Sequence, residues 1–399
     1  MGNFLDVTGH LAEPVMQRLS LPTGVLEVKI DSCAFKQDDL IEFAARNNMR
    51  RGFHFLSKVI GKHWPVAPHL MLTIHEYLAS RIPNGLPQPV VFIAMAETGI
   101  GLGQGVFEAY KASHPQSDAL FLHSTRYHLQ GQTCIEFSET HSHAPRHFLH
   151  LPTQAVFKKI LTSARSLVLV DDEASTGNTL ENLASTVREL NHFIEHIHLA
   201  VISNFMGSEA NQSLCNRFDA SVTLGCALNG EYSFKAENMQ EATCKAQLFI
   251  ANVDRGASPS FGRMGLDRPI SQPDLLAERL NTNIDSHHRV LVLGTGEFLH
   301  MAFLLAKSLE ALGVSVAVQS TTRSPILNWG AVSNTLELTD NYAEGIKNYL
   351  YNFFPEDYDH IFICHETPPN QALHHLAKTV GGRLFHFLSE HHIEEIPVC

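Results

Sequence analysis

The 399-residue sequence lacks any long hydrophobic run and has no surplus of positive charge. A membrane-spanning helix needs about 18 or more mainly apolar residues in succession, and no stretch of this sequence approaches that length. The formal net charge is -12, whereas a general nucleic-acid binder needs a basic surface to contact phosphates. The composition therefore argues against a membrane partner and against a nucleic-acid partner.

Cysteine pairs are also missing, because the seven cysteines are scattered and no two of them form a CxxC pair. Neither a disulfide framework nor a zinc knuckle is expected from that spacing. The first ten residues include Asp6 and no basic region, so we expect no secretory signal. A reduced, cytoplasmic protein fits these features best. The cysteines are Cys33, Cys134, Cys215, Cys226, Cys244, Cys364 and Cys399.

The remaining composition is that of a globular protein, with 44% hydrophobic and 18% charged residues. A chain of this length is expected to hold two or three domains. The stretch 252–273 is rich in Gly, Pro, Ser and Arg and is the expected boundary between domains. We predict a lead-in at 1–20, a first domain at 21–257 and a second domain at 275–399.

Short apolar runs of strand length alternate with helical patterns along the whole chain. This alternation is typical of a parallel sheet covered by helices on both faces, so the predicted fold class is α/β for both domains. Residues 124–150 show no clean period and are expected to form a long mobile loop. Strands are expected at 24–30, 90–95, 119–123, 166–170, 198–203, 290–293, 314–319 and 360–364, and helices at 38–47, 69–81, 180–190 and 298–312.

The strongest functional signal is an apolar strand that ends in two adjacent carboxylates, Asp171 and Asp172. In a parallel sheet these side chains lie at the carboxyl edge, where ligands bind. Carboxylates are strong acceptors for a ribose diol. The loop that follows, Glu173-Ala174-Ser175-Thr176-Gly177-Asn178-Thr179, opens a helix whose backbone N–H groups can hold a phosphate. An ordinary helix-capping turn is the alternative interpretation. The apolar strand, the acid pair and the loop occur together, however, and this combination favours a ligand-binding motif over a simple cap.

A basic segment stands out on this acidic chain between residues 46 and 63, where no acidic residue occurs. Such a concentration of positive charge suits a small, highly charged anion. A solvated basic helix face is an equally open interpretation. The basic residues of the segment are Arg46, Arg50, Arg51, Lys58 and Lys62.

The motif at 171–179 resembles the phosphoribosyl-pyrophosphate motif of the type I phosphoribosyltransferases, which has the form acid-acid-x-x-Ser/Thr-Thr-Gly-x-Thr. More narrowly, the chain is similar to a bacterial subgroup of these orotate phosphoribosyltransferase-like proteins that carries a C-terminal TRSP domain. That subgroup is associated with tellurium-resistance (Ter) stress operons. The similarity covers the chain from about residue 20 and includes 50–63, 96–103, 141–145 and Thr322-Arg323-Ser324-Pro325.

The resemblance implies a Rossmann-like core that binds 5-phosphoribosyl-1-pyrophosphate (PRPP) together with Mg²⁺. It implies transfer of the phosphoribosyl group to a small base-like nitrogenous acceptor, release of pyrophosphate, and a homodimer. The residues expected to bind PRPP are Asp171, Asp172, Ala174, Ser175, Thr176, Gly177, Asn178, Thr179, Ala96, Glu97, Thr98, Gly99, Lys58 and Lys62.

Two further stretches of the first domain are candidates for the same site. Residues 96–99 follow an apolar strand where related enzymes place the pyrophosphate loop, and Glu97 either holds magnesium through water or caps the next helix. Asp171 and Asp172 are the other candidates for contact with magnesium. The loop 124–150 matches the hood that covers PRPP in the superfamily, with Arg146 and His143 as candidate catalytic residues. Solvated loop histidines are the alternative there, and a His-x-His metal site is disfavoured because no familiar ligand spacing completes it.

The second domain contributes a glycine turn and an arginine. Gly294-Thr295-Gly296 follows a strand, but Leu299 replaces the third glycine of a dinucleotide fingerprint, which argues against NAD. The turn either binds a phosphate or is simply tight. Arg323 is expected at a strand end, where it contacts the acceptor or forms an interdomain salt bridge.

One departure from the family pattern leaves the acceptor open. Purine-salvage members often carry an Asp that assists proton removal at the position of Ser175. Orotate-type enzymes also lack that Asp, so the sequence does not define the base. A non-catalytic regulator or scaffold that senses PRPP or a nucleotide remains the alternative function.

Overall fold

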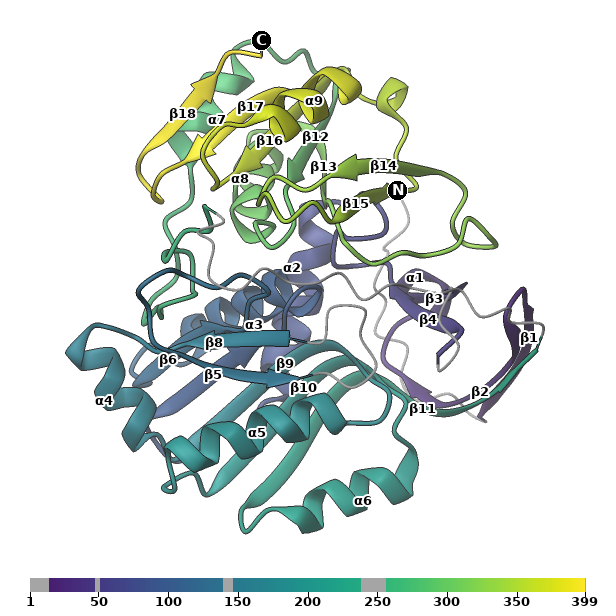
Figure 1. Ribbon diagram of the computed structural model, residues 1–399, viewed down its shortest axis with the longest axis vertical. Helices are drawn as coiled ribbons and strands as arrows, with labels where there is room; N and C mark the ends of the chain where they lie inside the picture. The colour runs from purple at the N-terminus through teal and green to yellow at the C-terminus, as the bar shows by residue number, and fades with distance from the viewer. Residues whose placement is uncertain (1–13, 47–50, 139–145, 238–255, 399) are drawn as a thin grey trace.

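A computed structural model describes residues 14–46, 51–138, 146–237 and 256–398 of the chain. They form two α/β domains that lie one above the other in Figure 1, with the N-terminal domain below. None of the described helices is both long enough and apolar enough to cross a membrane.

The first domain is built on a seven-stranded sheet. Five neighbouring strands are parallel, and the longest of them also pairs antiparallel with the second strand of the chain, which in turn pairs antiparallel with the first. The strand order is β1 (Val15–Leu21), β2 (Gly24–Cys33), β11 (Ser221–Ala236), β10 (His196–Asn204), β9 (Ser166–Ala174), β5 (Val90–Ala94) and β6 (Ala119–His123).

Helices cover both faces of this sheet, as the alternating pattern predicts (Figure 1). Val168 and Val170 of β9 belong to the core on the side of α2 and α3, while Leu167 and Leu169 belong to the core on the side of α4 and α5. Because both faces are buried there, the strand is apolar at every position from Leu167 to Val170. The helices are α2 (Pro68–Arg81), α3 (Gly99–Ser113), α4 (Ala155–Ser163), α5 (Asn178–Leu190) and α6 (Gly207–Arg217).

The second domain has a five-stranded sheet in the order β13-β12-β16-β17-β18, in which the last strand is antiparallel to its neighbour. A hairpin of β14 and β15 lies beside it. The strands are β12 (Arg289–Gly294), β13 (Ser315–Ser320), β14 (Thr335–Thr339), β15 (Lys347–Tyr351), β16 (His360–His365), β17 (Arg383–Phe387) and β18 (Ile393–Ile396). The helices are α7 (Asp274–Asn281), α8 (His300–Ala311), η1 (Pro355–Asp357) and α9 (Gln371–Val380).

The two domains share a broad interface in which α8 packs on α2 and α3. Backbone hydrogen bonds also cross it, because Val66 and Val318 exchange N–H···O bonds of 2.9 and 2.8 Å. The segment that leads into the second domain lies along the edge of the first sheet, where Phe121 and Leu266 form a bridge. The two domains therefore pack directly against each other and are not simply connected by a linker.

The predicted helix at 38–47 is wrong. Only α1 (Gln37–Leu40) is helical, and β3 (Ile41–Ala45) then pairs antiparallel with β4 (Phe53–Ser57). Ile41 and Phe43 are buried with half-buried Glu42 between them, and the ring of Phe43 packs on that of Phe55. Burial of this alternating apolar face favours a strand over the helix that the spacing suggested.

Two expectations about irregular segments also differ from the structure. Residues 15–20, predicted as lead-in, belong to β1. The predicted loop at 124–150 contains a hairpin of β7 (Cys134–Ser138) and β8 (Arg146–His150). The tip of that hairpin at 139–145, which includes His141 and His143, lies outside the described residues.

Candidate active site

The acid pair lies at the carboxyl end of β9, next to the loop that follows β5. The Thr98 hydroxyl donates a 2.7 Å hydrogen bond to Oδ1 of Asp172, and the Asp172 amide donates a 2.9 Å hydrogen bond to Oδ1 of Asp171. Asp172 is buried, and that burial raises the pKa of its carboxyl. The structure thus brings together the two segments that the sequence singled out, 96–99 and 171–179.

A glycine at the start of α3 permits this close approach of helix and strand. At Gly99, the first residue of α3, a Cβ atom would lie 2.9 Å from Oδ1 of Asp171 and 3.1 Å from its Cα atom. Any larger residue would push the start of α3 away from β9. The positive end of α3 is therefore held against the acid pair, where it favours a bound anion.

The loop after the acid pair opens α5 through a left-handed residue. Gly177, the N-cap, has φ of +74°, and a Cβ atom there would lie 2.5 Å from Sδ of Met206. No side chain caps α5, although the Asn178 amide has a long 3.5 Å contact with the Thr176 hydroxyl. Thr176 and Asn178 are exposed, whereas Ala174 is buried. The start of α5 therefore presents backbone N–H groups and hydroxyls toward solvent.

The basic segment reaches this loop through Arg51. Its guanidinium forms a short ion pair with the carboxylate of Glu173 and stacks 5.2 Å from the centre of the Phe53 ring. Burial raises the pKa of Glu173, although the charge of Arg51 opposes that shift. Arg50 falls outside the described residues, and the Arg46 amide is bonded to the carbonyl of Gly52.

Lys62, which was predicted to bind PRPP, is buried in the domain interface. Its side chain is only 1% exposed and its Nζ lies 3.0 Å from Oε1 of Glu97. The same ammonium donates to the carbonyl of Gly296 at 2.5 Å, to the Ser320 hydroxyl at 3.1 Å and to the carbonyl of Thr321 at 3.3 Å. The lysine thus ties the 96–99 loop to the second domain.

Arg323 engages the same loop from the second domain. Its backbone N–H lies 3.4 Å and its Nε 3.9 Å from Oε2 of Glu97. Its Nη2 donates to the Tyr127 hydroxyl at 3.0 Å and to Glu344 at 2.8 Å. Nη1 is buried and has no hydrogen-bond partner among the described residues. Of the two interpretations of Arg323, the interdomain ion pair is present, and one N–H group remains for a further contact.

The glycine turn of the second domain is tight, and the interface uses its polar groups. A Cβ atom at Gly294 would lie 2.5 Å from the Phe298 carbonyl oxygen. The Gly296 amide donates a 2.8 Å hydrogen bond to the Thr321 hydroxyl, while its carbonyl accepts from Lys62. The turn therefore meets Lys62 of the first domain across the interface, and Lys62 in turn pairs with Glu97.

Two other predicted site residues, Lys58 and Arg146, make their observed contacts away from the acid pair and the 96–99 loop. The ammonium of Lys58 donates to the Asp38 carbonyl at 2.6 Å and lies 5.7 Å from the centre of the Trp64 ring. Arg146 pairs across the hairpin with Glu136, with its Nη2 2.7 Å from Oε2. The hairpin strand β7 contacts α5, so Arg146 lies on an element beside the phosphate loop. His143 falls in the undescribed tip.

Sequence reasoning missed a buried charged centre between the domains. Arg263 lies 2.9 Å from Oε2 of Glu297 and 2.6 Å from Oε2 of Glu366, and all three side chains are 2% exposed or less. Burial alone would lower the pKa of Arg263, but the two carboxylates outweigh it and raise the pKa. Arg263 is one of several arginines in a stretch rich in Gly, Pro and Ser, and nothing in that pattern indicates that it is buried. Beside it the rings of Tyr127 and Tyr342 stack 3.9 Å apart.

Sequence families match both halves of the chain. One described as phosphoribosyl transferase matches residues 40–231, and the TRSP domain, described as C-terminal to that transferase, matches residues 261–380. The chain carries a phosphoribosyltransferase domain followed by a TRSP domain. The TRSP match begins within the boundary stretch predicted from composition, 252–273. A search of curated proteins found no significant match.

Solved phosphoribosyltransferases match part of the chain at low identity and with low TM-scores. The adenine phosphoribosyltransferase of Trypanosoma brucei, determined with AMP, pyrophosphate and ribose-5-phosphate, is 11% identical, with a TM-score of 0.33 over 47% of this chain and 76% of that one. The APRTase of Giardia lamblia, in complex with 9-deazaadenine, is 13% identical, with a TM-score of 0.32 over 47% and 93%. The orotate phosphoribosyltransferase of Francisella tularensis is 16% identical, with a TM-score of 0.26 over 40% and 67%.

Proposed function

We propose that this protein transfers a 5-phosphoribosyl group from PRPP to a nitrogenous, base-like acceptor and releases pyrophosphate. One observation carries the proposal. The acid pair Asp171-Asp172 lies between the starts of two helices, α3 and α5, at one edge of a parallel sheet. Carboxylates for a diol and two positive helix ends for phosphates match the three parts of PRPP.

Each part of PRPP has an assigned partner in this proposal. Asp171 and Asp172 accept hydrogen bonds from the ribose hydroxyls, and residues 174–179 hold the 5-phosphate through backbone N–H groups and hydroxyls. Residues 96–99 and the start of α3 hold the pyrophosphate. Arg51, held by Glu173, supplies positive charge beside the phosphate loop.

The donor set fits magnesium at the acid pair but not at Glu97. Carboxylate oxygens suit Mg²⁺, and the structure places those of Asp171 and Asp172 at the carboxyl end of β9, beside the 96–99 loop. Glu97 already lies between Lys62 and Arg323, so a third cation there would meet two positive charges. Bound together with PRPP, Mg²⁺ would neutralise pyrophosphate charge, and Asp171 and Asp172 would hold it in place.

The reaction itself needs little covalent chemistry from the protein. The bond from ribose C1 to the pyrophosphate oxygen breaks, the bond from C1 to the acceptor nitrogen forms, and the acceptor loses a proton. The chain contributes by positioning the substrates, by complementing the charge of the leaving pyrophosphate and by excluding water. Arg146 on β8 is proposed to close over the site, with His143 as the other predicted catalytic residue.

We also propose that the TRSP domain serves the same site. Arg323 contacts Glu97 of the 96–99 loop, the Gly294–Gly296 turn is linked to that loop through Lys62, and Nη1 of Arg323 is available for the acceptor or for PRPP. A homodimeric enzyme that makes a nucleotide-like metabolite in tellurium-resistance-associated stress is proposed from the family resemblance alone. A cytoplasmic location is proposed from the cysteine spacing and the N-terminal residues.

The test is pyrophosphate release from PRPP and Mg²⁺ with a panel of purine, pyrimidine and nicotinic-type bases. The proposal expects base-dependent release by the wild-type chain. Tight binding of PRPP without turnover for any base would favour the PRPP-sensing regulator instead.

A further inference from the structure

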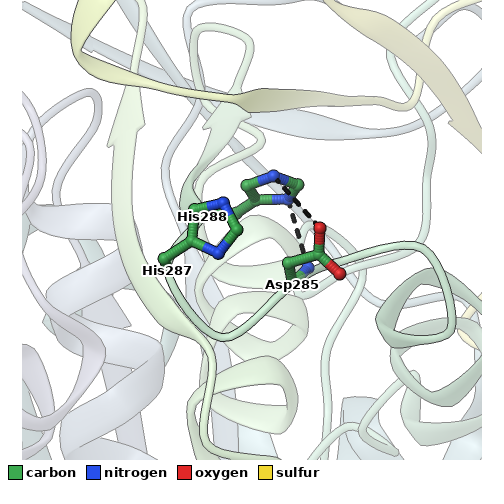
Figure 2. A group of neighbouring side chains, drawn as sticks. All are labelled: Asp285, His287 and His288. Atoms are coloured by element: carbon green, nitrogen blue, oxygen red, sulfur yellow. Dashed lines mark hydrogen bonds and ion pairs between the residues drawn. The ribbon is translucent and has the colours of Figure 1, made fainter.

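The turn between α7 and β12 carries three side chains with metal-ligand chemistry at one place on the surface of the TRSP domain. They are Asp285, His287 and His288, and Figure 2 shows them gathered around the same side of the turn. One ligand atom from each lies within 4.8 Å of the others. The turn precedes the amino end of β12, whereas Gly294 ends that strand at the domain interface. At about 3.3 Å per residue the two places are roughly 17 Å apart.

The separation of two of these groups suits a shared ion. Nε2 of His288 lies 3.6 Å from Oδ2 of Asp285. Zinc binds imidazole nitrogen at about 2.0–2.1 Å and carboxylate oxygen at about 2.0–2.2 Å, so two ligands of a tetrahedral ion lie about 3.4 Å apart. Imidazole and carboxylate together are typical ligands of zinc and similar divalent transition metals. His287 adds a second imidazole, with its ring centre 4.6 Å from that of His288.

A neighbouring strand supplies a group that can orient His288. Nε2 of His360, the first residue of β16, lies 3.0 Å from Nδ1 of His288. Metal-bound histidines usually use their second ring nitrogen in such a contact, which fixes the tautomer. Asp359 lies beside the same cluster, and the Arg289 amide and the three nearby histidines lower the pKa of its carboxyl.

We propose that Asp285, His287 and His288 bind one zinc-like divalent transition-metal ion, and that His360 positions His288 for this role. Water completes the coordination at this exposed turn. The site stands apart from the phosphoribosyl site and does not depend on the function proposed above.

Binding requires one local exchange of hydrogen bonds. In the structure the Asp285 amide donates to Nδ1 of His288 at 3.1 Å, so the neutral ring carries its proton on Nε2. An ion at Nε2 displaces that proton, and the ring then carries a proton on Nδ1. That proton is donated to Nε2 of His360, while the Asp285 amide turns to water. His360 is therefore expected to matter even though it is not a ligand.

The experiment is a titration of the full chain, freed of any affinity tag, with zinc chloride against a chromogenic zinc chelator. Because the chain holds 25 histidines, the matched control is a second exposed histidine pair, His391 and His392. We expect one competing zinc per chain in the wild type and in His391→Ala/His392→Ala. His287→Ala/His288→Ala should lose that zinc, with affinity falling more than tenfold.

Further variants keep the test decisive. Asp285→Asn removes one ligand charge without removing a ring and should also weaken binding. His360→Ala should weaken zinc binding about tenfold with the ligands intact, and His360→Gln, which retains an acceptor, should restore part of the loss. Unchanged zinc stoichiometry and affinity in His287→Ala/His288→Ala, or an equal loss in the His391/His392 control, would overturn the proposal. Phosphoribosyl transfer should be the same in all these variants.

Discussion

Among single residues, Asp172 illustrates how binding chemistry opposes stability. Its carboxyl is buried at the end of β9 and its pKa is raised by that burial, so the charged form is less favourable in the folded chain than in the unfolded chain. The contribution of this residue to stability therefore falls as the pH rises from its ordinary pKa of 3.8 through the raised folded value. Two acceptors for a ligand diol are a reason to retain such a residue.

We predict that Asp172→Asn melts at a higher temperature than the wild type at pH 7. The amide has no charge to desolvate, and its oxygen can still accept from Thr98. The gain should shrink as the pH is lowered toward the ordinary pKa of aspartate, because the wild-type carboxyl then becomes neutral too. Differential scanning calorimetry across that range tests this, with exposed Asp118→Asn as the control. A gain that is independent of pH would show that the charge of Asp172 is not its cause.

The pair of Arg51 and Glu173 gives a second prediction at the same scale. Arg51→Met leaves the mostly buried Glu173 without its cation, so we expect a loss of about 1–3 kcal/mol in the free energy of unfolding. Glu173→Gln in the same chain should recover much of that loss, since the neutral amide does not need the cation. Urea unfolding of the two single variants and the double variant measures the coupling. Strictly additive losses would contradict the ion pair.

Whether the role of a single residue can be predicted from the sequence depends on how far along the chain its partners lie. The acid pair and its loop are contiguous, so their role could be predicted from local order. The partners of Lys62 could not, because its contacts with Gly296, Ser320 and Thr321 are made by residues far away in the sequence. A lysine among arginines suggests a surface, and only the packing of the second domain buries it.

Among elements, the start of α5 depends on the left-handed conformation of Gly177. A side chain there costs about 1–2 kcal/mol in backbone energy, and its Cβ atom would also meet Met206. We predict that Gly177→Ala destabilises the chain by about 2 kcal/mol and weakens PRPP binding at least fivefold, because the N–H groups of the loop move.

Gly131 provides the matched control for that variant. Its φ of +76° is almost the same, but no heavy atom lies within 4 Å of the position of its Cβ. Gly131→Ala should cost the backbone energy alone and leave PRPP affinity unchanged. Melting curves and calorimetric titration with PRPP separate the two effects. Equal effects of both substitutions on affinity would mean that the turn at Gly177 is not part of the binding site.

Elements also show where sequence patterns mislead. Most of the parallel strands were predicted from a short continuous apolar run, which burial on two faces requires. The parallel strands β11 and β17 were not predicted. The segments 38–47 and 124–150 were misassigned because their strands pair in isolated hairpins, where the apolar pattern is only five residues long. Strand β3 pairs with β4 outside the predicted helix, and β7 pairs with β8 within 124–150, so the local period is a weak guide.

At the scale of the whole molecule, the domains meet through charges that also hold the 96–99 loop. Glu97 lies between Lys62 of its own domain and Arg323 of the TRSP domain. Removing a buried partner of an ion pair is strongly destabilising. We predict that Lys62→Met lowers the free energy of unfolding by about 3–5 kcal/mol, measured by urea unfolding. Lys58→Met, at the half-exposed lysine of the same segment, should change it by less than about 1 kcal/mol.

Arg323 tests whether the second domain acts on the reaction. We predict that Arg323→Ala keeps measurable PRPP affinity and lowers the transfer rate about tenfold or more, because the loop and its N–H donors lose their support. Arg323→Lys keeps the charge near Glu97 and Glu344 but not the planar guanidinium. Its transfer rate should therefore lie between those of the wild type and Arg323→Ala. A transfer rate in Arg323→Ala equal to that of the wild type would show that the TRSP domain has another role.

The central claim is that PRPP binds at Asp171 and Asp172. Calorimetric titration of the full chain with PRPP and Mg²⁺ measures it directly, with Asp171→Asn/Asp172→Asn as the variant and Asp118→Asn as the control. Losing charge-assisted hydrogen bonds of about 1.5–3 kcal/mol each predicts at least a tenfold weaker affinity in the folded double variant. An affinity equal to that of the wild type would contradict the account.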